Sequence, residues 1–204
     1  MLVRGSLFAA AAVSALLAGA PAFGQSVSGT VNVNGFVTGT CVVVGGASGS
    51  SFTGAIALGE LDDAGTGKIS TALSTSTAAS PAGSQTFTVN CNSGAPSVTL
   101  SATSLKDSAS APPSGYTNTV DYTAELDVGL AAGGTSNFSY PTPSGPVVGG
   151  TALSGPMSTS ANNVTVKVYH VNTDGGVNSS LLTTGNYGTP SGIGGVISIT
   201  ISPT

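Results

Sequence analysis

Residues 25–44 read QSVSGTVNVNGFVTGTCVVV, and this stretch decides the fold. Between Ser26 and Asn34, valine or glycine occupies every odd position, and serine, threonine or asparagine occupies every even one. Alternation with a period of two predicts a β-strand with one buried face. From Phe36 to Val44 both faces become partly apolar, which is typical of a strand inside a β-sandwich.

The same alternation recurs downstream, between connections rich in glycine, serine, threonine and proline. We predict further strands at Ala55–Leu58, Gln85–Cys91, Ser97–Ala102, Val120–Leu130, Asn163–Val171 and Val196–Ile201. The stretch 103–160 has the weakest pattern, and we expect long loops there. Many short strands separated by turns, without a convincing helical period, indicate an all-β antiparallel sandwich.

The composition excludes several classes of function. Only 6% of the 204 residues are charged, with 4 Lys and Arg against 8 Asp and Glu. So few cations cannot neutralise a run of phosphates, so we expect no nucleic acid as a partner. A basic helix lying on a membrane surface is excluded for the same reason. A hydrophobic content of 40% also argues against intrinsic disorder.

The N-terminus has the layout of a secretory signal peptide. Arg4 precedes the apolar run Leu7–Ala18, and small residues at cleavage spacing follow in Ala20–Gly24. We expect residues 1–24 to be removed, leaving a mature chain that starts near Gln25. The apolar run is short for the alternative, a transmembrane anchor. The mature protein is therefore expected outside the cytoplasm.

Two cysteines remain, Cys41 and Cys91. In an exported protein such a pair predicts one structural disulfide. It would close a loop of about fifty residues and stabilise the fold by about 4 kcal/mol on the chain-entropy estimate. Neither cysteine belongs to a C-x-x-C motif, and a single histidine cannot complete a zinc site with them. We therefore expect no metal site and no cofactor.

The sequence also offers little for catalysis. His170 is the only histidine, and we expect it on the solvent side of its strand together with Lys167. No G-x-S-x-G nucleophile elbow is present in a strand–turn–helix context, so we assign no catalytic residue. Asp62 and Asp63 lie in a glycine-rich turn, which we interpret as a solvated turn rather than a weak calcium site.

Five short motifs follow one another along the mature chain. The first is SGTVNVNGFV after the signal peptide, followed by Cys41. The others are ALGEL at 57–61, FTVNC at 87–91, NNVTV at 162–166, and GTP at 188–190 leading to the alternating isoleucines of the last strand. Together they resemble the fimbrial subunits of the chaperone–usher pathway, occur in that family's order and cover most of the mature chain. Both the type 1-like branch and the spore coat U-like, archaic branch share this architecture, and the branch stays open.

The resemblance implies an incomplete immunoglobulin-like sandwich, residues 36–204, that lacks its last strand. The extension 25–35 would fill the open groove of the next subunit by β-augmentation, that is, by donor-strand complementation. The implied donor residues are Val27, Gly29, Val31 and Val33, and the implied groove residues are Val37, Ile197, Ile199 and Ile201. Such contacts run head to tail and propagate a fibre.

The implied function is that of a structural subunit of a surface fimbria that supports adhesion or biofilm formation. Its implied partners are other copies or related pilin subunits, a periplasmic chaperone and an outer-membrane usher. The chain would travel through the periplasm to the cell surface. Two alternatives stay open, a self-complemented secreted β-sandwich that acts as an adhesin or coat protein, and a secreted hydrolase. A stable monomer would favour the first alternative over a fimbrial subunit.

Overall fold

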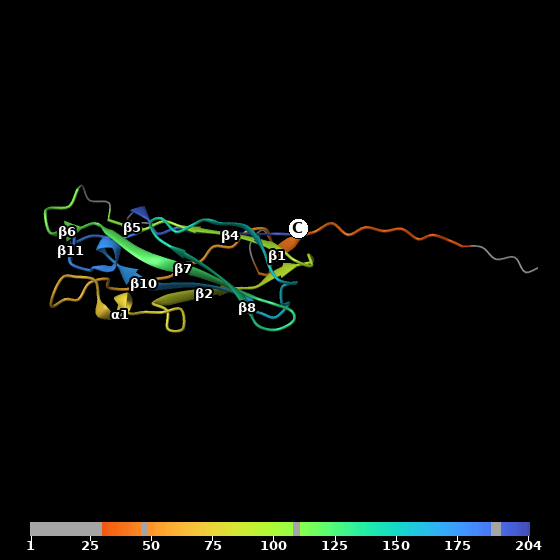
Figure 1. The fold of residues 1–204 in the computed structure, drawn as a ribbon, viewed down its shortest axis with the longest axis horizontal. Coiled ribbons are helices and arrows are strands. Elements are labelled where there is room, and N and C mark those ends of the chain that lie inside the picture. The colour runs from red at the N-terminus through yellow and green to blue at the C-terminus, as the bar shows by residue number, and fades with distance from the viewer. Residues whose placement is uncertain (1–29, 46–48, 108–110, 189–192) are drawn as a thin grey trace, which may run out of the picture. The chain divides into compact units, whose positions relative to one another are not determined.

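Alternating apolar residues build most of the described structure as antiparallel β-strands (Figure 1). The computed structural model describes residues 30–45, 49–107, 111–188 and 193–204. The predicted signal peptide, Val27 and Gly29 lie outside these ranges. The chain divides into two units, 1–36 and 37–204, and every described strand belongs to the second. In the first unit the described residues 30–36 form no strand.

The first layer of the sandwich is the larger sheet. Its strands follow the order β12-β5-β7-β10-β2, and β8 pairs with the second half of β7. The bounds are β2 Gly83–Phe87, β5 Leu105–Lys106, β7 Thr119–Gly129, β8 Thr135–Pro141, β10 Val164–Asn172 and β12 Ile193–Gly194. The long strands β7 and β10 pair antiparallel and lie side by side in Figure 1, so they form the centre of this layer.

The second layer is a sheet of three strands in the order β13-β4-β9. Its bounds are β4 Ser97–Ala102, β9 Val148–Ala152 and β13 Ile197–Ser202. β13 pairs antiparallel with β4 along its whole length, with Ile199 opposite Leu100. Smaller elements complete the domain: β1 Cys41–Val43, β3 Val89–Cys91, β6 Tyr116–Thr117, β11 Leu181–Leu182, the short helix α1 Thr71–Ser74 and the 3-10 turn η1 Asp174–Gly176.

The core lies between the two layers and is made by their alternating inward residues. Val98 and Leu100 of β4 are fully buried, as are Val120, Leu126 and Val128 of β7. Each fully buried side chain of this size contributes roughly 1.5–3 kcal/mol of hydrophobic stabilisation. The all-β sandwich predicted from the alternation is therefore confirmed.

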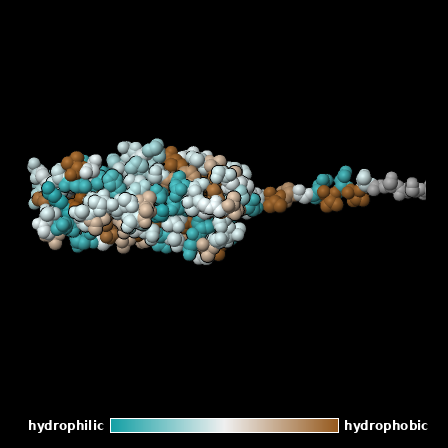
Figure 2. All heavy atoms as spheres, turned by 60° about the horizontal axis from the view of Figure 1, so that its bottom comes forward, coloured by the Kyte–Doolittle hydropathy of each residue, from teal (hydrophilic) through white to brown (hydrophobic). Residues whose placement is uncertain are grey.

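The outer face of the first layer carries a small ionic cluster. Lys167 of β10 lies 3.3 Å from Glu125 of β7 and also pairs with Asp127. Its ammonium group keeps a raised pKa because Asp127 and then Glu125 accept its hydrogen bonds, although burial opposes the shift. Elsewhere the surface is largely uncharged, and on the face shown in Figure 2 hydrophobic residues appear as separate spots among polar ones.

Two parts of the strand prediction are wrong. The stretch 103–160 holds β8 and β9 in addition to β7, so it is more regular than its sequence pattern indicated. Conversely, Ala55–Leu58 is extended and alternating but is not a strand, because it forms no ladder with any described strand. Pairing depends on a neighbour that is distant in sequence, so local alternation fixes which face is buried but not whether a partner is present.

His170 is exposed as predicted, but the reason is a bulge rather than simple alternation. Strict alternation from Val164, Val166 and Val168 would turn residue 170 inward. The register of β10 against β7 shifts between Tyr169 and Asn172, and His170 has φ of 50°. This local kink turns His170 to solvent and buries Val171 instead.

Candidate functional site

The last strand, β13, has one paired edge and one open edge. It pairs with β4 on one side, and no described strand pairs with it on the other. Ile197, Ile199 and Ile201 point toward the core, yet all three are only half-buried, whereas the inward residues of β4 are fully or almost fully buried. An open edge above an incompletely covered core is a template for another strand.

A second open edge faces β13 across the same layer. Residues 52–58 alternate like a strand, with Phe52, Ile56 and Leu58 half-buried and the residues between them exposed. No backbone hydrogen bond joins this segment to any described part of the chain. The strand order of the described sheets gives it no neighbour. Its peptide groups are therefore available to a partner strand.

Glycines bring this segment close to the inner face of β2. A β-carbon at Gly54 would lie 2.9 Å from the side chains of Gln85 and Phe87. A β-carbon at Gly83 would overlap the side chain of Ile56. The segment thus packs over the first layer and occupies the same layer as β13.

A groove separates β13 from residues 52–58. It consists of two adjoining cavities of about 320 and 370 Å³, which share Phe52 and Ile197. Its floor is the inner face of the first layer, with Val166, Val168 and Phe87 among the residues. Most side chains that line it are apolar, although polar and apolar atoms share its exposed surface about equally. Among the described residues, neither the outer edge of β13 nor the backbone of residues 52–58 has a strand partner. The gap therefore has the chemistry of a missing β-strand.

The polar side chains of Gln85 and Tyr122 contribute to this floor, and that of Tyr122 is buried. Tyr122 of β7 is only 3% exposed, and its hydroxyl has no hydrogen-bond partner among the described residues. Burial alone raises the pKa of this phenol, so the group stays neutral at every physiological pH. Nothing at this position resembles a nucleophile or a general base poised for catalysis.

The groove opens at one end into a larger third cavity, which we call the end cavity. Its volume is about 570 Å³, and it shares Ile56, Leu58, Leu105 and Gly195 with the groove. Residues 58–62 form one side and residues 182–188 the other. Its lining mixes leucines with polar groups such as Glu60 and Thr184, so it is more polar than the groove.

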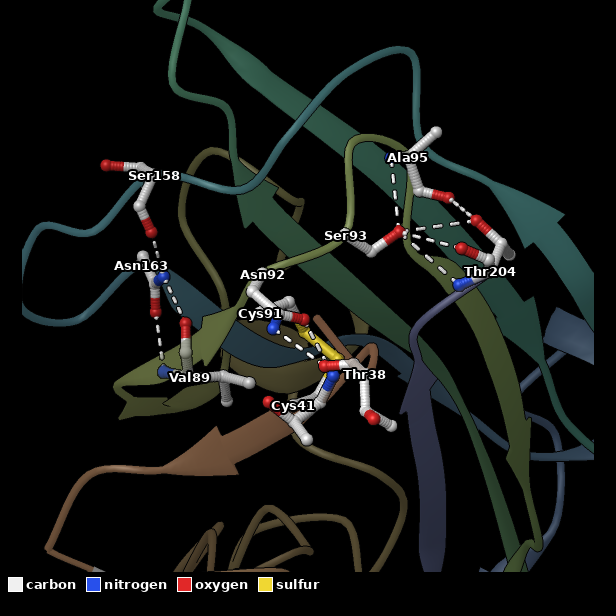
Figure 3. Close-up of a disulfide and its surroundings, with 11 residues drawn as sticks. Thr38, Cys41, Val89, Cys91, Asn92, Ser93, Ala95, Ser158, Asn163 and Thr204 are labelled. Carbon is white, nitrogen blue, oxygen red and sulfur yellow. Dashed lines mark hydrogen bonds between the residues drawn. A yellow bond between two sulfur atoms is a disulfide. The ribbon is translucent and has the colours of Figure 1, made fainter. Parts of the chain in front are cut away.

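The other end of the groove is fixed by the disulfide. Cys41 of β1 is bonded to Cys91 of β3, as predicted, and the two cysteines face each other in the antiparallel register. Beside them, the amide of Asn92 accepts a hydrogen bond from the N–H of Thr40 at 2.7 Å and donates one to the carbonyl of Thr38 at 2.9 Å (Figure 3). The segment entering β1 is thereby fastened to the strand that carries Cys91.

Asn163 closes the junction between β2 and β3 (Figure 3). Its side-chain oxygen accepts a hydrogen bond from the N–H of Val89 at 2.8 Å, and its amide donates to the carbonyl of Val89 at 2.7 Å. The amide also donates to the carbonyl of Ser158. One buried side chain therefore replaces two ladder bonds at the point where the regular pairing of β2 with β10 ends.

The predicted groove residues fall into two groups. Ile197, Ile199 and Ile201 lie together along one wall of the groove. Val37 does not belong there: it is 85% exposed and lines none of the three cavities, because the chain between Thr30 and Thr40 forms no strand. Of the donor residues, Val31 and Val33 are 89% and 90% exposed, and the other two lie outside the described residues.

The opposite wall of the groove, Phe52 to Leu58, was not assigned a role from the sequence. The signal was nevertheless present, because the same alternation predicted a strand at Ala55–Leu58. What could not be read was that this strand lacks a partner. Because this extended, alternating segment has no described strand partner, it borders the groove instead of lying inside a sheet.

The disulfide also bears on where the protein functions. Bonds of this kind persist in oxidising compartments outside the cytoplasm. Within the described residues, no helix has the length and apolar character needed to cross a membrane.

Comparisons with protein-family models, curated proteins and solved structures find no match to this chain.

Proposed function

We propose that this protein is a structural subunit of a surface fimbria, which polymerises by donor-strand complementation after chaperone–usher secretion. The observation that carries the proposal is the groove between β13 and residues 52–58, whose two walls have no strand partner among the described residues on the groove side. A domain with this gap is stabilised when an extended segment with alternating apolar side chains fills it.

The chain carries a segment with that pattern. Val27, Gly29, Val31 and Val33 share one face of the extension 25–35. The groove offers inward positions with the same two-residue spacing at Ile201, Ile199 and Ile197, and Gly195 lies at its end. Three donor positions can therefore face three isoleucines, which supports insertion of the extension of one copy into the groove of another. The partners are then further copies or related pilin subunits, with a periplasmic chaperone and an outer-membrane usher before assembly.

The test uses a matched pair of substitutions in the extension of the full chain. Val31→Asp places a carboxylate on the inward face, and Asn32→Asp places one on the outward face of the next residue. Burying an unpaired carboxylate costs several kcal/mol, so we expect Val31→Asp to abolish the oligomer ladder seen on unboiled denaturing gels. Asn32→Asp should keep the ladder.

Deletion of residues 25–35 should also leave only monomers, and the deleted chain should regain partners when a peptide of sequence 25–35 is supplied. A full-length chain that is folded, stable and monomeric without a chaperone contradicts the proposal. That outcome favours the alternative of a secreted β-sandwich that acts alone as an adhesin or coat protein.

A further inference from the structure

The end cavity lies outside the stretch that the four donor positions fill. It begins at Gly195, where the groove ends, and extends between residues 58–62 and 182–188. Leu58, Leu61, Leu182 and Tyr187 give it an apolar side. Its volume of about 570 Å³ exceeds that of either groove cavity, so it has room for more than one side chain.

Two large apolar residues follow the donor positions in the sequence. Phe36 is 93% exposed and Val37 is 85% exposed. They immediately precede Thr38, which the amide of Asn92 holds in place. These two adjacent, exposed apolar side chains follow the proposed donor strand directly. Association with a second copy of the chain can therefore bury them.

The register of the donor strand decides where this pair arrives. Every ladder formed by β13 and β4 is antiparallel, and antiparallel pairing is slightly more stable per residue than parallel pairing. An antiparallel donor places Val27 beside Ile201 and Val33 beside Gly195. At about 3.4 Å per residue, the next four residues advance roughly 13 Å beyond Gly195, which leads into the end cavity.

We propose that the Phe36–Val37 step of a second copy docks in the end cavity. This inference rests on the proposed function, because it requires that the extension of the second copy fill the groove. Val37 keeps the inward parity of the donor residues and enters the cavity, and Phe36 covers its rim. The contact fixes the register of the donor strand and brings the two domains together at the groove end.

Cross-linking distinguishes this arrangement from its reverse. A chain with Val37→Cys is mixed with a chain carrying Thr184→Cys, since Thr184 is an exposed residue of the end cavity. A second mixture uses Ser202→Cys at the other end of β13, which is the end toward which Val37 would lie if the donor ran parallel. Among the described residues both native cysteines are already bonded to each other, so no other thiol competes.

We expect an intermolecular disulfide between residues 37 and 184 and none between residues 37 and 202. The reverse result overturns the docking proposal and leaves donor-strand exchange intact. A cross-link at neither position, in oligomers that still form, also overturns it. Chains that form no oligomer overturn both proposals, so the two failures are distinguishable.

A kinetic measurement tests the contribution of the contact. Phe36→Ala and Val37→Ala should each accelerate dissociation of the oligomers by about tenfold or more, since each removes apolar area buried at the junction. Val177→Ala is the matched control, because Val177 is 72% exposed, follows η1 and lines neither the groove nor the end cavity. Equal dissociation rates for all three variants and the unmodified chain refute the inference.

Discussion

Replacing Asn163 with alanine removes the one side chain that satisfies both peptide groups of Val89. Val89 is 3% exposed and Asn163 is 7% exposed, so water does not easily replace the lost bonds. Each buried group left without a partner costs about 1–3 kcal/mol, which gives roughly 2–6 kcal/mol for the N–H and carbonyl of Val89. A domain of this size is stable by only about 5–15 kcal/mol, so the loss is a large fraction of the total.

The assay is urea unfolding of the mature chain, followed by circular dichroism and by tyrosine fluorescence, since the chain has no tryptophan. Asn186→Ala is the control, because Asn186 is exposed in the loop after β11. Asn163→Asp adds a second comparison. Its carboxylate still accepts a hydrogen bond from the N–H of Val89, but it faces the carbonyls of Val89 and Ser158, to which the asparagine amide donated. We therefore expect a similar loss of unfolding free energy at neutral pH and a partial recovery in acid. If Asn163→Ala costs no more than Asn186→Ala, the reasoning on buried peptide groups is refuted.

Three further predictions concern covalent, ionic and acid-dependent stability. Cys41→Ser combined with Cys91→Ser opens a loop of 50 residues and should lower the free energy of unfolding by about 4 kcal/mol; a loss below about 1 kcal/mol in urea contradicts this. Lys167→Met leaves the two carboxylates of β7 without their cation and should destabilise the domain by about 1–3 kcal/mol, an effect that calorimetry can measure and that Lys167→Arg should largely avoid. Hydrogen bonds from Ser180 and its neighbour lower the pKa of Asp174, so this carboxylate stabilises the fold above its ordinary pKa and the contribution disappears as the pH falls through the lowered value. Asp174→Asn should therefore be less stable than the unmodified chain at about pH 6 but not at about pH 2, and a difference independent of pH contradicts the assignment.

Strands with strict alternation and a ladder partner were predictable from the sequence. β4 spans the predicted residues, and β10 and β13 differ from their predicted bounds by one residue at each end. Apolar residues occupy every second position of these strands, so the sequence shows which face of each strand is buried. The disulfide was predictable as well, since an exported chain with two cysteines has one simple pairing.

The features that define the candidate site depend on pairs that are distant in sequence. Ala55–Leu58 and β13 have similar alternation. Neither pattern reveals that the segment lacks a described strand partner on the side that faces the groove. The exposure of His170 depends on a bulge in β10, and the role of Asn163 depends on a break in β2. Val37 was misplaced because alternation continues through it although no strand forms there. In each case the missing information is the identity of the neighbouring chain segment.

The disulfide has a consequence for how the domain carries load. Tension applied to the chain before Thr38 reaches Cys41 within three residues and passes through the sulfur atoms directly to Cys91. The residues between the two cysteines, 42–90, amount to roughly 170 Å of extended chain and lie outside the path of the force. Residues 52–58 belong to this enclosed part. Tension on the domain therefore does not pull directly on this wall of the groove.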